Sequence, residues 1–549
     1  MNKITLLCGC LLACFATSAQ PMLPNQKTDS RPSLQSLELN ARCVNSPLNV
    51  MTTRAEEPIY EAPEGEKVLY ERTSYGYYYE WDTLQFGKRE GGISIVYTED
   101  GEAYIRNPVA GWGTNTYLRG TMTDEGIEVT LPQLIDVEPD FENIGGTILF
   151  YAAVMKCVDS SDDYVTYEVV EENVTFLIDD EGNISFNLSG NDQTPNKDII
   201  MGLCDDQGRL FFGDAAQYLT KVNLSNITPP EGLELEDWQF YAYGEPHSIK
   251  VGFDGEDIYL RNFDYVYTPR TWIKGKIDGD NVTFESGQFL AEEYGYFYYF
   301  LAATLENNLY AIEPSITFQY SREKNMMTVP EGQCMVSNPR LSSISNTYPD
   351  YMPYEDPVIK KSGFISSYVP ANPKFIGFVD FFFEMGMNYC EFHLYPYSED
   401  YDPIDTSQLS FRLYINDEMV DNFSPGSNMT DFPYGFWGED PNLMTIFQLG
   451  TNLVMYLYDR NIKSIGVQLI NTTPEGEEFE SALVIYDVTT DSVIIDQEDG
   501  VEMLLGDDVV SSECYDLNGL RCDPTSKGLH IIVERHSDGS ITSRKVMRR

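Results

Sequence analysis

Apolar and polar residues alternate along most of the chain from about residue 66. Residues 174–178 (Val-Thr-Phe-Leu-Ile) and 316–318 (Ile-Thr-Phe) show the pattern, and turn residues such as those at 180–183 separate one run from the next. A period of two residues is typical of antiparallel strands with one buried face. The sequence therefore predicts an all-β protein with little helix after residue 20.

One passage of this pattern occurs twice. Tyr-Ile-Arg-Asn at 104–107 returns as Tyr-Leu-Arg-Asn at 259–262, and Thr-Tyr-Leu-Arg-Gly at 116–120 returns as Thr-Trp-Ile-Lys-Gly at 271–275, so both blocks are displaced by 155 positions. A shared offset predicts two copies of one antiparallel module, at residues 66–232 and 233–345. Many sequential strands with short turns indicate a sandwich or a barrel-like module, and we favour the sandwich. Tyr104 and Gly120 are expected to superimpose on Tyr259 and Gly275.

The remaining chain divides by composition. Residues 1–19 have a lysine, a short apolar run and small residues before Gln20, which is typical of a secretory signal peptide. Cleavage there predicts an exported protein at the cell surface or in the extracellular space, whereas a lipid anchor at Cys14 is the alternative. Residues 20–65 read as a leader or linker, 346–490 as a third β domain, and 491–549 as a small C-terminal β domain.

Charge and motifs exclude several functions. The chain has 36 Lys+Arg against 87 Asp+Glu, a net charge of −51, which disfavours nucleic acid and anionic membranes as partners. No later apolar run is long enough to span a membrane. Its four histidines are not at metal-ligand spacing, and no nucleophile motif, P-loop or dinucleotide fingerprint is present. We therefore expect no enzyme and no cofactor other than calcium.

Two segments resemble known modules. Residues 464–468 (Ser-Ile-Gly-Val-Gln), with 432–436 (Phe-Pro-Tyr-Gly-Phe) upstream, resemble a fibronectin type III-like module of exported Bacteroidetes proteins. Residues 514–521, the Lys-Gly-Leu-His run at 527–530 and the basic end at 545–549 are similar to the C-terminal sorting domain of the type IX secretion system. That resemblance implies the secretion machinery as a partner. Cys514 and Cys522 flank a turn and form the one plausible disulfide.

Candidate ligand residues are aromatic side chains in loops, because a flat apolar ring with a polar rim binds sugars and proteins. Trp112 lies between two glycines, Tyr265 and Tyr267 occupy the equivalent loop of the second copy, and Trp437 precedes another glycine. Each tryptophan either plugs the end of its own domain or is presented to a ligand.

A separate acidic loop is the one candidate metal site. It carries Asp400, Asp402 and Asp405, which form either a calcium site or a solvated turn.

These observations leave three hypotheses for the function. The first is a non-catalytic surface protein that uses tandem β modules for adhesion or for glycan or partner binding. The second is a carbohydrate-active enzyme with a carboxylate pair in one repeat. The third is a structural envelope protein.

Overall fold

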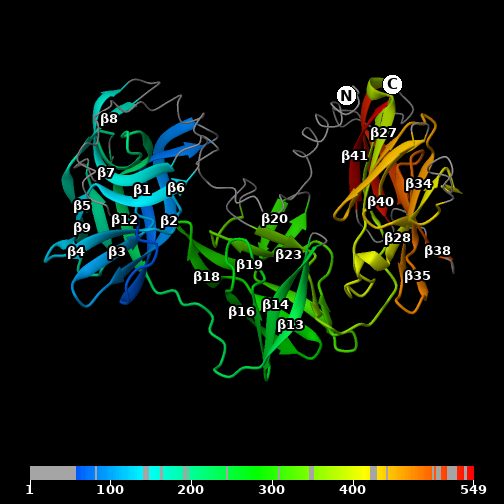
Figure 1. Cartoon of the computed structure of the whole chain (residues 1–549), viewed down its shortest axis with the longest axis horizontal. Helices are drawn as coiled ribbons and strands as arrows, with labels where there is room; N and C mark the ends of the chain where they lie inside the picture. The colour runs from blue at the N-terminus through cyan, green and yellow to red at the C-terminus, as the bar shows by residue number, and fades with distance from the viewer. Residues whose placement is uncertain are drawn as a thin grey trace. The chain divides into compact units, whose positions relative to one another are not determined.

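The computed structural model describes residues 57–502 except 81–82, 140–146, 161–164, 189–194, 196, 243–244, 307–308, 345–351, 421–428, 441–442 and 498–499, together with the strands at 509–515, 528–536 and 541–548. The chain forms two compact units, Met1–Ser362 and Gly363–Arg549 (Figure 1). Nearly all regular structure is antiparallel β, as predicted. Among the described residues the helical elements are one four-residue helix and one 3-10 turn. The predicted signal peptide, most of the predicted leader and Cys522 lie outside the described residues.

The first module consists of twelve strands: β1 (Glu66–Glu80), β2 (Thr83–Tyr97), β3 (Glu102–Arg106), β4 (Tyr117–Met122), β5 (Gly126–Leu131), β6 (Gln133–Pro139), β7 (Thr147–Ser160), β8 (Val165–Val170), β9 (Glu172–Ile178), β10 (Ile184–Asn187), β11 (Ile199–Cys204) and β12 (Leu210–Val222). Eight of them form a ring in the order β1-β2-β3-β4-β5-β9-β10-β12, which closes because β12 also pairs with β1. The strands β11, β7, β6 and β8 extend from β12 as a side sheet.

The second module repeats this arrangement with β13 (Leu235–Ala242), β14 (Glu245–Asp254), β15 (Asp257–Arg261), β16 (Trp272–Asp278), β17 (Asn281–Glu285), β18 (Gln288–Glu293), β19 (Tyr296–Glu306), β20 (Leu309–Glu313), β21 (Ser315–Ser321), β22 (Met326–Thr328), β23 (Gln333–Asn338), β24 (Met352–Glu355) and β25 (Val358–Lys361). Its barrel is β13-β14-β15-β16-β17-β21-β22-β25, and its side sheet is β18-β19-β23-β24 with β20. The duplication is confirmed strand by strand. Closure leaves no free strand edge in the ring, so the barrel-like form of the predicted sandwich or barrel-like module describes both copies.

Register and side-chain contacts confirm the duplication in detail. Tyr104 pairs with Arg119 on β4, and Tyr259 pairs with Lys274 on β16. The amide Nε2 of Gln133 donates to the carbonyl of Arg119, and that of Gln288 donates to the carbonyl of Lys274, at 2.7 and 2.8 Å. Both modules therefore use one packing plan. The second extends to β25, beyond the boundary at residue 345 that the sequence suggested.

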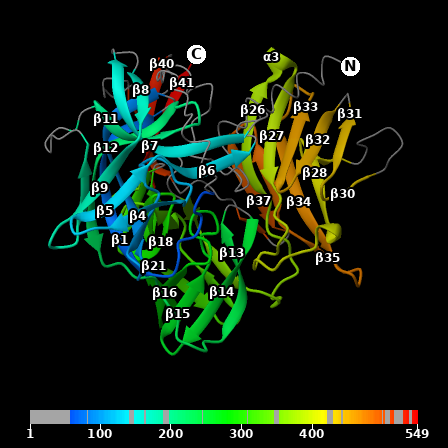
Figure 2. The ribbon, with the colours of Figure 1, turned by 60° about the vertical axis from the view of Figure 1, so that its left-hand side comes forward.

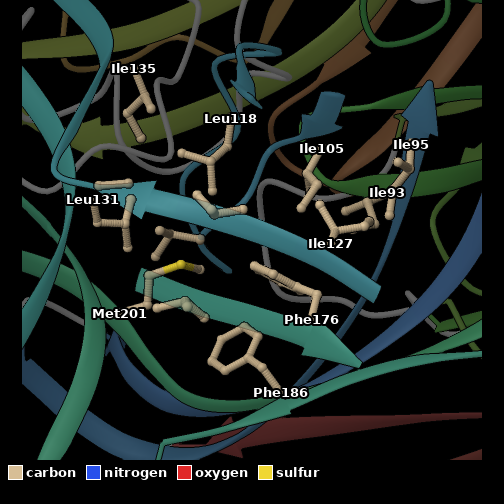
Figure 3. Packing of buried hydrophobic residues seen from close by; sticks show 14 of the residues in the cluster. Ile93, Ile95, Ile105, Leu118, Ile127, Leu131, Ile135, Phe176, Phe186 and Met201 are labelled. Atoms are coloured by element: carbon tan, nitrogen blue, oxygen red, sulfur yellow. The ribbon is translucent and has the colours of Figure 1, made fainter. Parts of the chain in front are cut away.

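Each barrel interior is filled by the inward face of its strands. In the first, Ile93, Ile105, Ile127 and Phe176 come from four different strands and are fully buried, and they point into one continuous core with their neighbours (Figure 3). The alternation of apolar and polar residues in the sequence produces this core, because every second residue of a strand faces inward.

A hairpin of the second module packs on the first barrel. The Arg106 guanidinium lies 3.1 Å from Glu292 and 3.2 Å from Glu293, at the end of β18. The backbone N–H of Gly92 donates to the carbonyl of Gly295 at 2.9 Å. A side chain at Gly92 would collide with the ring of Phe297, so glycine permits this close approach.

The second unit contains β26 (Lys374–Phe381), α3 (Phe382–Met385), β27 (Met387–His393), η3 (Thr406–Gln408), β28 (Leu409–Ile415), β29 (Glu418–Met419), β30 (Phe432–Pro433), β31 (Trp437–Asp440), β32 (Met444–Leu449), β33 (Asn452–Leu457), β34 (Ser464–Thr472), β35 (Glu478–Glu480), β36 (Leu483–Asp487), β37 (Ser492–Gln497), β38 (Gly500–Glu502), β39 (Val509–Tyr515), β40 (Gly528–His536) and β41 (Ile541–Arg548). A sheet β26-β27-β33-β32-β31 packs on a sheet β29-β28-β34-β36-β37-β38, which β30 and β35 join, and one core lies between them (Figure 2). This is a sandwich, and it continues past residue 490 through β37 and β38. The strands β39, β40 and β41 form a separate three-stranded sheet.

Candidate functional site

Trp112 is a lid of the first barrel. Its side chain is only 3% exposed and packs on Phe150, with the ring centroids 4.6 Å apart, and on Phe212 at 5.9 Å. The loop between β3 and β4 therefore folds inward and seals the barrel. The interior of an eight-stranded barrel is filled by side chains, and the indole of Trp112 is one of them. Trp112 is consequently not available to a ligand, which corrects its assignment as a candidate ligand residue.

The equivalent loop of the second module has the same role. Tyr267 stands 155 positions after Trp112 and stacks on Tyr298 at 5.5 Å. Tyr298 is the equivalent of Phe150 by strand pairing. Phe150 pairs with Asp136, and Tyr298 pairs with Ala291, which stands 155 positions after Asp136. The two loops differ in sequence but make the same lid contact. Tyr267 is only half-buried, however, so its assignment as a candidate ligand residue stays a prediction.

Tyr265 belongs to this second lid as well. Its ring is 37% exposed and lies 4.5 Å from the ring of His247. Asp264 organises the loop, since its carboxylate accepts hydrogen bonds from the backbone N–H groups of Val266, Tyr267 and Thr268 at 2.9 to 3.2 Å. The loop is therefore a compact cap, and Tyr265 packs on it with one edge in solvent.

The acidic loop of the second unit is a structural turn. One carboxylate oxygen of Asp402 accepts hydrogen bonds from Ser366 N at 2.9 Å, Ser367 N at 2.9 Å and Ser398 Oγ at 3.2 Å. Asp405 caps η3 by accepting from Ser407 N. Hydrogen-bond donors thus surround this oxygen of Asp402, where a calcium ion would otherwise bind. Within the described residues, no group of three or more acidic, His or Cys side chains is placed to hold a metal, and the calcium site at Asp400, Asp402 and Asp405 stays a prediction.

Trp437 is the sequence candidate that the structure presents openly. It begins β31, the edge strand of the first sandwich sheet, and its side chain is 80% exposed. It pairs directly with Phe447 on β32. Figure 2 shows β31, β32, β33 and β27 side by side in this sheet.

Aromatic rings continue from Trp437 across the same face of the sheet, where Phe447 and Tyr389 are half-buried and Tyr456 is only 9% exposed. Phe447 lies 5.9 Å from Tyr456 on β33, which lies 5.9 Å from Tyr389 on β27. We call Trp437, Phe447, Tyr456 and Tyr389 the aromatic strip. It crosses four strands, so at about 4.8 Å per strand it is about 14 Å long.

Polar groups border the strip. The hydroxyl of Tyr389 donates to Glu391, and His393 Nε2 lies 3.7 Å from the same carboxylate. Burial acts to raise the pKa of Glu391, but the contacts with His393 and Tyr389 outweigh it and hold that pKa below its usual value. Burial raises the pKa of Tyr389. The strip therefore ends in a carboxylate that is ionised at neutral pH and a phenol that keeps its proton.

A pocket of about 600 Å³ lies elsewhere in the sandwich. Tyr395, Tyr397 and Tyr401 form one side, as stacked rings with centroids 5.1 and 5.0 Å apart. Carboxylates of Glu480 and Asp496, from distant parts of the chain, border it. The sequence analysis missed this pocket, although the alternating tyrosines from 395 to 401 were visible beside the acidic loop.

The chain was compared with known proteins at three levels. No protein-family model, no curated protein and no solved structure matches it. No helix among the described residues is both long and apolar enough to cross a membrane. Functional argument therefore depends on the site geometry alone.

Proposed function

We propose that this protein is an exported, non-catalytic binding protein that holds a neutral glycan chain on the aromatic strip. The observation that carries the proposal is Trp437, a large ring 80% exposed at the end of a row of aromatic side chains. Exposing an indole to water is unfavourable. An indole that remains exposed beside other rings is typical of an interaction site.

The chemistry of the strip suits sugars. A pyranose ring has apolar C–H faces that pack on aromatic rings, and hydroxyls that need polar partners at the margin. Glu391 offers acceptors, and His393 lies beside it. With a net charge of −51, the protein repels acidic polysaccharides at low salt, which favours a neutral ligand.

Export and surface display are part of the same proposal. They are supported by the signal-like residues 1–19 and by the resemblance of the C-terminal segment to a sorting domain. On this proposal the barrels act as a rigid stem, because their lids are closed, and the sandwich supplies adhesion. The proposal also includes that the sandwich is a fibronectin type III-like module and that the protein comes from a Bacteroidetes bacterium.

The test is affinity electrophoresis of the chain without residues 1–19 in gels that contain neutral polysaccharides such as xylan, β-glucan, mannan or starch. Wild type should be retarded by at least one of them, and Trp437→Ala should migrate as it does without ligand. Leu449→Ala is the matched control, since Leu449 is 74% exposed on the same sheet but has no ring. Release of soluble sugar by the protein would contradict the non-catalytic proposal.

A further inference from the structure

We propose that the tyrosine-lined pocket of the sandwich is a second binding site, which takes the terminal mono- or disaccharide of a neutral glycan. None of the residues that line it belongs to the aromatic strip. Its volume of about 600 Å³ lies within the range of about 300 to 1,000 Å³ that small-molecule sites occupy. The choice of a sugar rests on the function proposed above, whereas the pocket does not.

The walls of the pocket are fixed before any ligand arrives. Arg412 Nη1 donates to Glu480 at 2.6 Å, and Gln468 Nε2 donates to the carbonyl of Ser481 at 3.0 Å. Asn372 Oδ1 accepts from the backbone N–H of Ala482 at 3.0 Å. Side chains already held in place lose little entropy on binding, which favours affinity for a small ligand.

The tyrosine side is held just as firmly. Asp402 ties the loop that carries Tyr401 to the segment at Ser366 and Ser367. Ser367 Oγ also donates to Glu399 at 3.0 Å, which places this carboxylate at the rim. The acidic loop thus positions pocket residues.

Tyr401 is held in an unfavourable backbone conformation. Its φ is +61°, in the left-handed region where glycine or asparagine is the usual residue and a bulky side chain is an outlier. Such strain is destabilising and concentrates at functional sites. The ring of Tyr401 extends the stack along the pocket, so an aromatic side chain here is useful to a ligand although it is costly to the fold.

The lining chemistry indicates the ligand class. Glu399, Glu480 and Asp496 offer acceptors, whereas Lys374 is the single cationic side chain of the lining. Burial raises the pKa of Tyr395 to about 12, so its hydroxyl remains a donor. Donors and acceptors mixed around aromatic rings suit several hydroxyl groups, and the excess of carboxylates disfavours an acidic sugar.

The test is isothermal titration of the chain without residues 1–19 with glucose, galactose, mannose, N-acetylglucosamine and their disaccharides, with glucuronic acid as the anionic comparison. At least one neutral sugar should bind. Tyr401→Gly should weaken it by about tenfold or more without lowering the melting temperature, because glycine relieves the strained φ. Asp496→Asn should also weaken it, and Trp437→Ala should leave it unchanged.

Three outcomes would overturn the pocket proposal: no neutral sugar of the panel binds, binding survives Tyr401→Gly, or glucuronic acid binds more tightly than the neutral sugars. Loss of small-sugar binding in Trp437→Ala would assign that binding to the strip and equally exclude the pocket. Whether the aromatic strip binds a glycan is tested separately, by the retardation of wild type and Trp437→Ala in the polysaccharide gels. The two proposals can therefore fail independently.

Discussion

Replacing Trp112 by alanine tests the lid assignment. The indole is 3% exposed and contacts Phe150 and Phe212, so the change removes a buried ring and leaves a cavity between them. A buried aromatic covers about 150 to 250 Å², which at about 25 cal/mol per Å² corresponds to about 4 to 6 kcal/mol. Measured aromatic truncations in cores give about 3 to 5 kcal/mol. We expect a loss of about 4 kcal/mol in the first module.

The assay is hydrogen exchange of peptides from β7 and β12 in the intact chain, since these strands carry Phe150 and Phe212 and report on the first module. Protection there should fall strongly in Trp112→Ala. The matched control is Trp437→Ala, the same chemical change at a side chain that is 80% exposed, which should change stability by less than about 0.5 kcal/mol. Unchanged exchange in Trp112→Ala would refute the lid and reopen the loop as a ligand site.

Three further outcomes follow from buried polar groups. Arg106→Ala should increase hydrogen exchange in the β18–β19 hairpin and lower its stability by about 3 kcal/mol, because it removes a cationic partner from Glu292, whose side chain is 1% exposed. The double variant Arg106→Ala with Glu292→Gln should regain part of that stability. Burial raises the pKa of Asp214 to about 6 from its usual 3.8, so folding favours its protonated form. The contribution of this group to stability is fully present below about pH 4 and falls by about 3 kcal/mol as pH rises through 6. Denaturant titrations of Asp214→Asn should lack this component of the pH dependence. Calcium should leave the melting temperature unchanged and EDTA should not lower it, whereas Asp402→Ala should lower it in either solution; stabilisation by calcium would restore the metal assignment.

The sequence predicted the fold well because the fold depends on local signals. Period-two alternation and turn residues define antiparallel strands wherever they occur, and the offset of 155 between Tyr104 and Tyr259 survives because both sit on equivalent strands. Barrel closure was harder to predict. It depends on β12 meeting β1, a pairing between residues far apart in the chain that alternation alone does not specify.

The exposure of the candidate site residues could not be predicted from the neighbouring sequence. Trp112 and Tyr267 stand in loops of different sequence, which suggested function, yet each makes the same contact inside its barrel. Whether a loop aromatic turns inward depends on the space that distant strands leave. The sequence did not distinguish Trp437 from Trp112, because both are loop tryptophans beside a glycine; the fold shows that Trp437 is 80% exposed. The pocket could not be predicted, since Tyr401 and Asp496 are far apart in the chain and line one pocket only through the sandwich fold.

The account depends most on whether the sandwich binds a glycan through its exposed ring. The most direct measurement is the dissociation constant of the chain without residues 1–19 for the polysaccharide that retards it most. It is measured for wild type and for Trp437→Ala, once the two proteins have been shown to have the same melting temperature. The account predicts a loss of at least about tenfold in affinity, equivalent to about 1.4 kcal/mol. Equal affinity in the two proteins, or no retardation by any neutral polysaccharide, would contradict it.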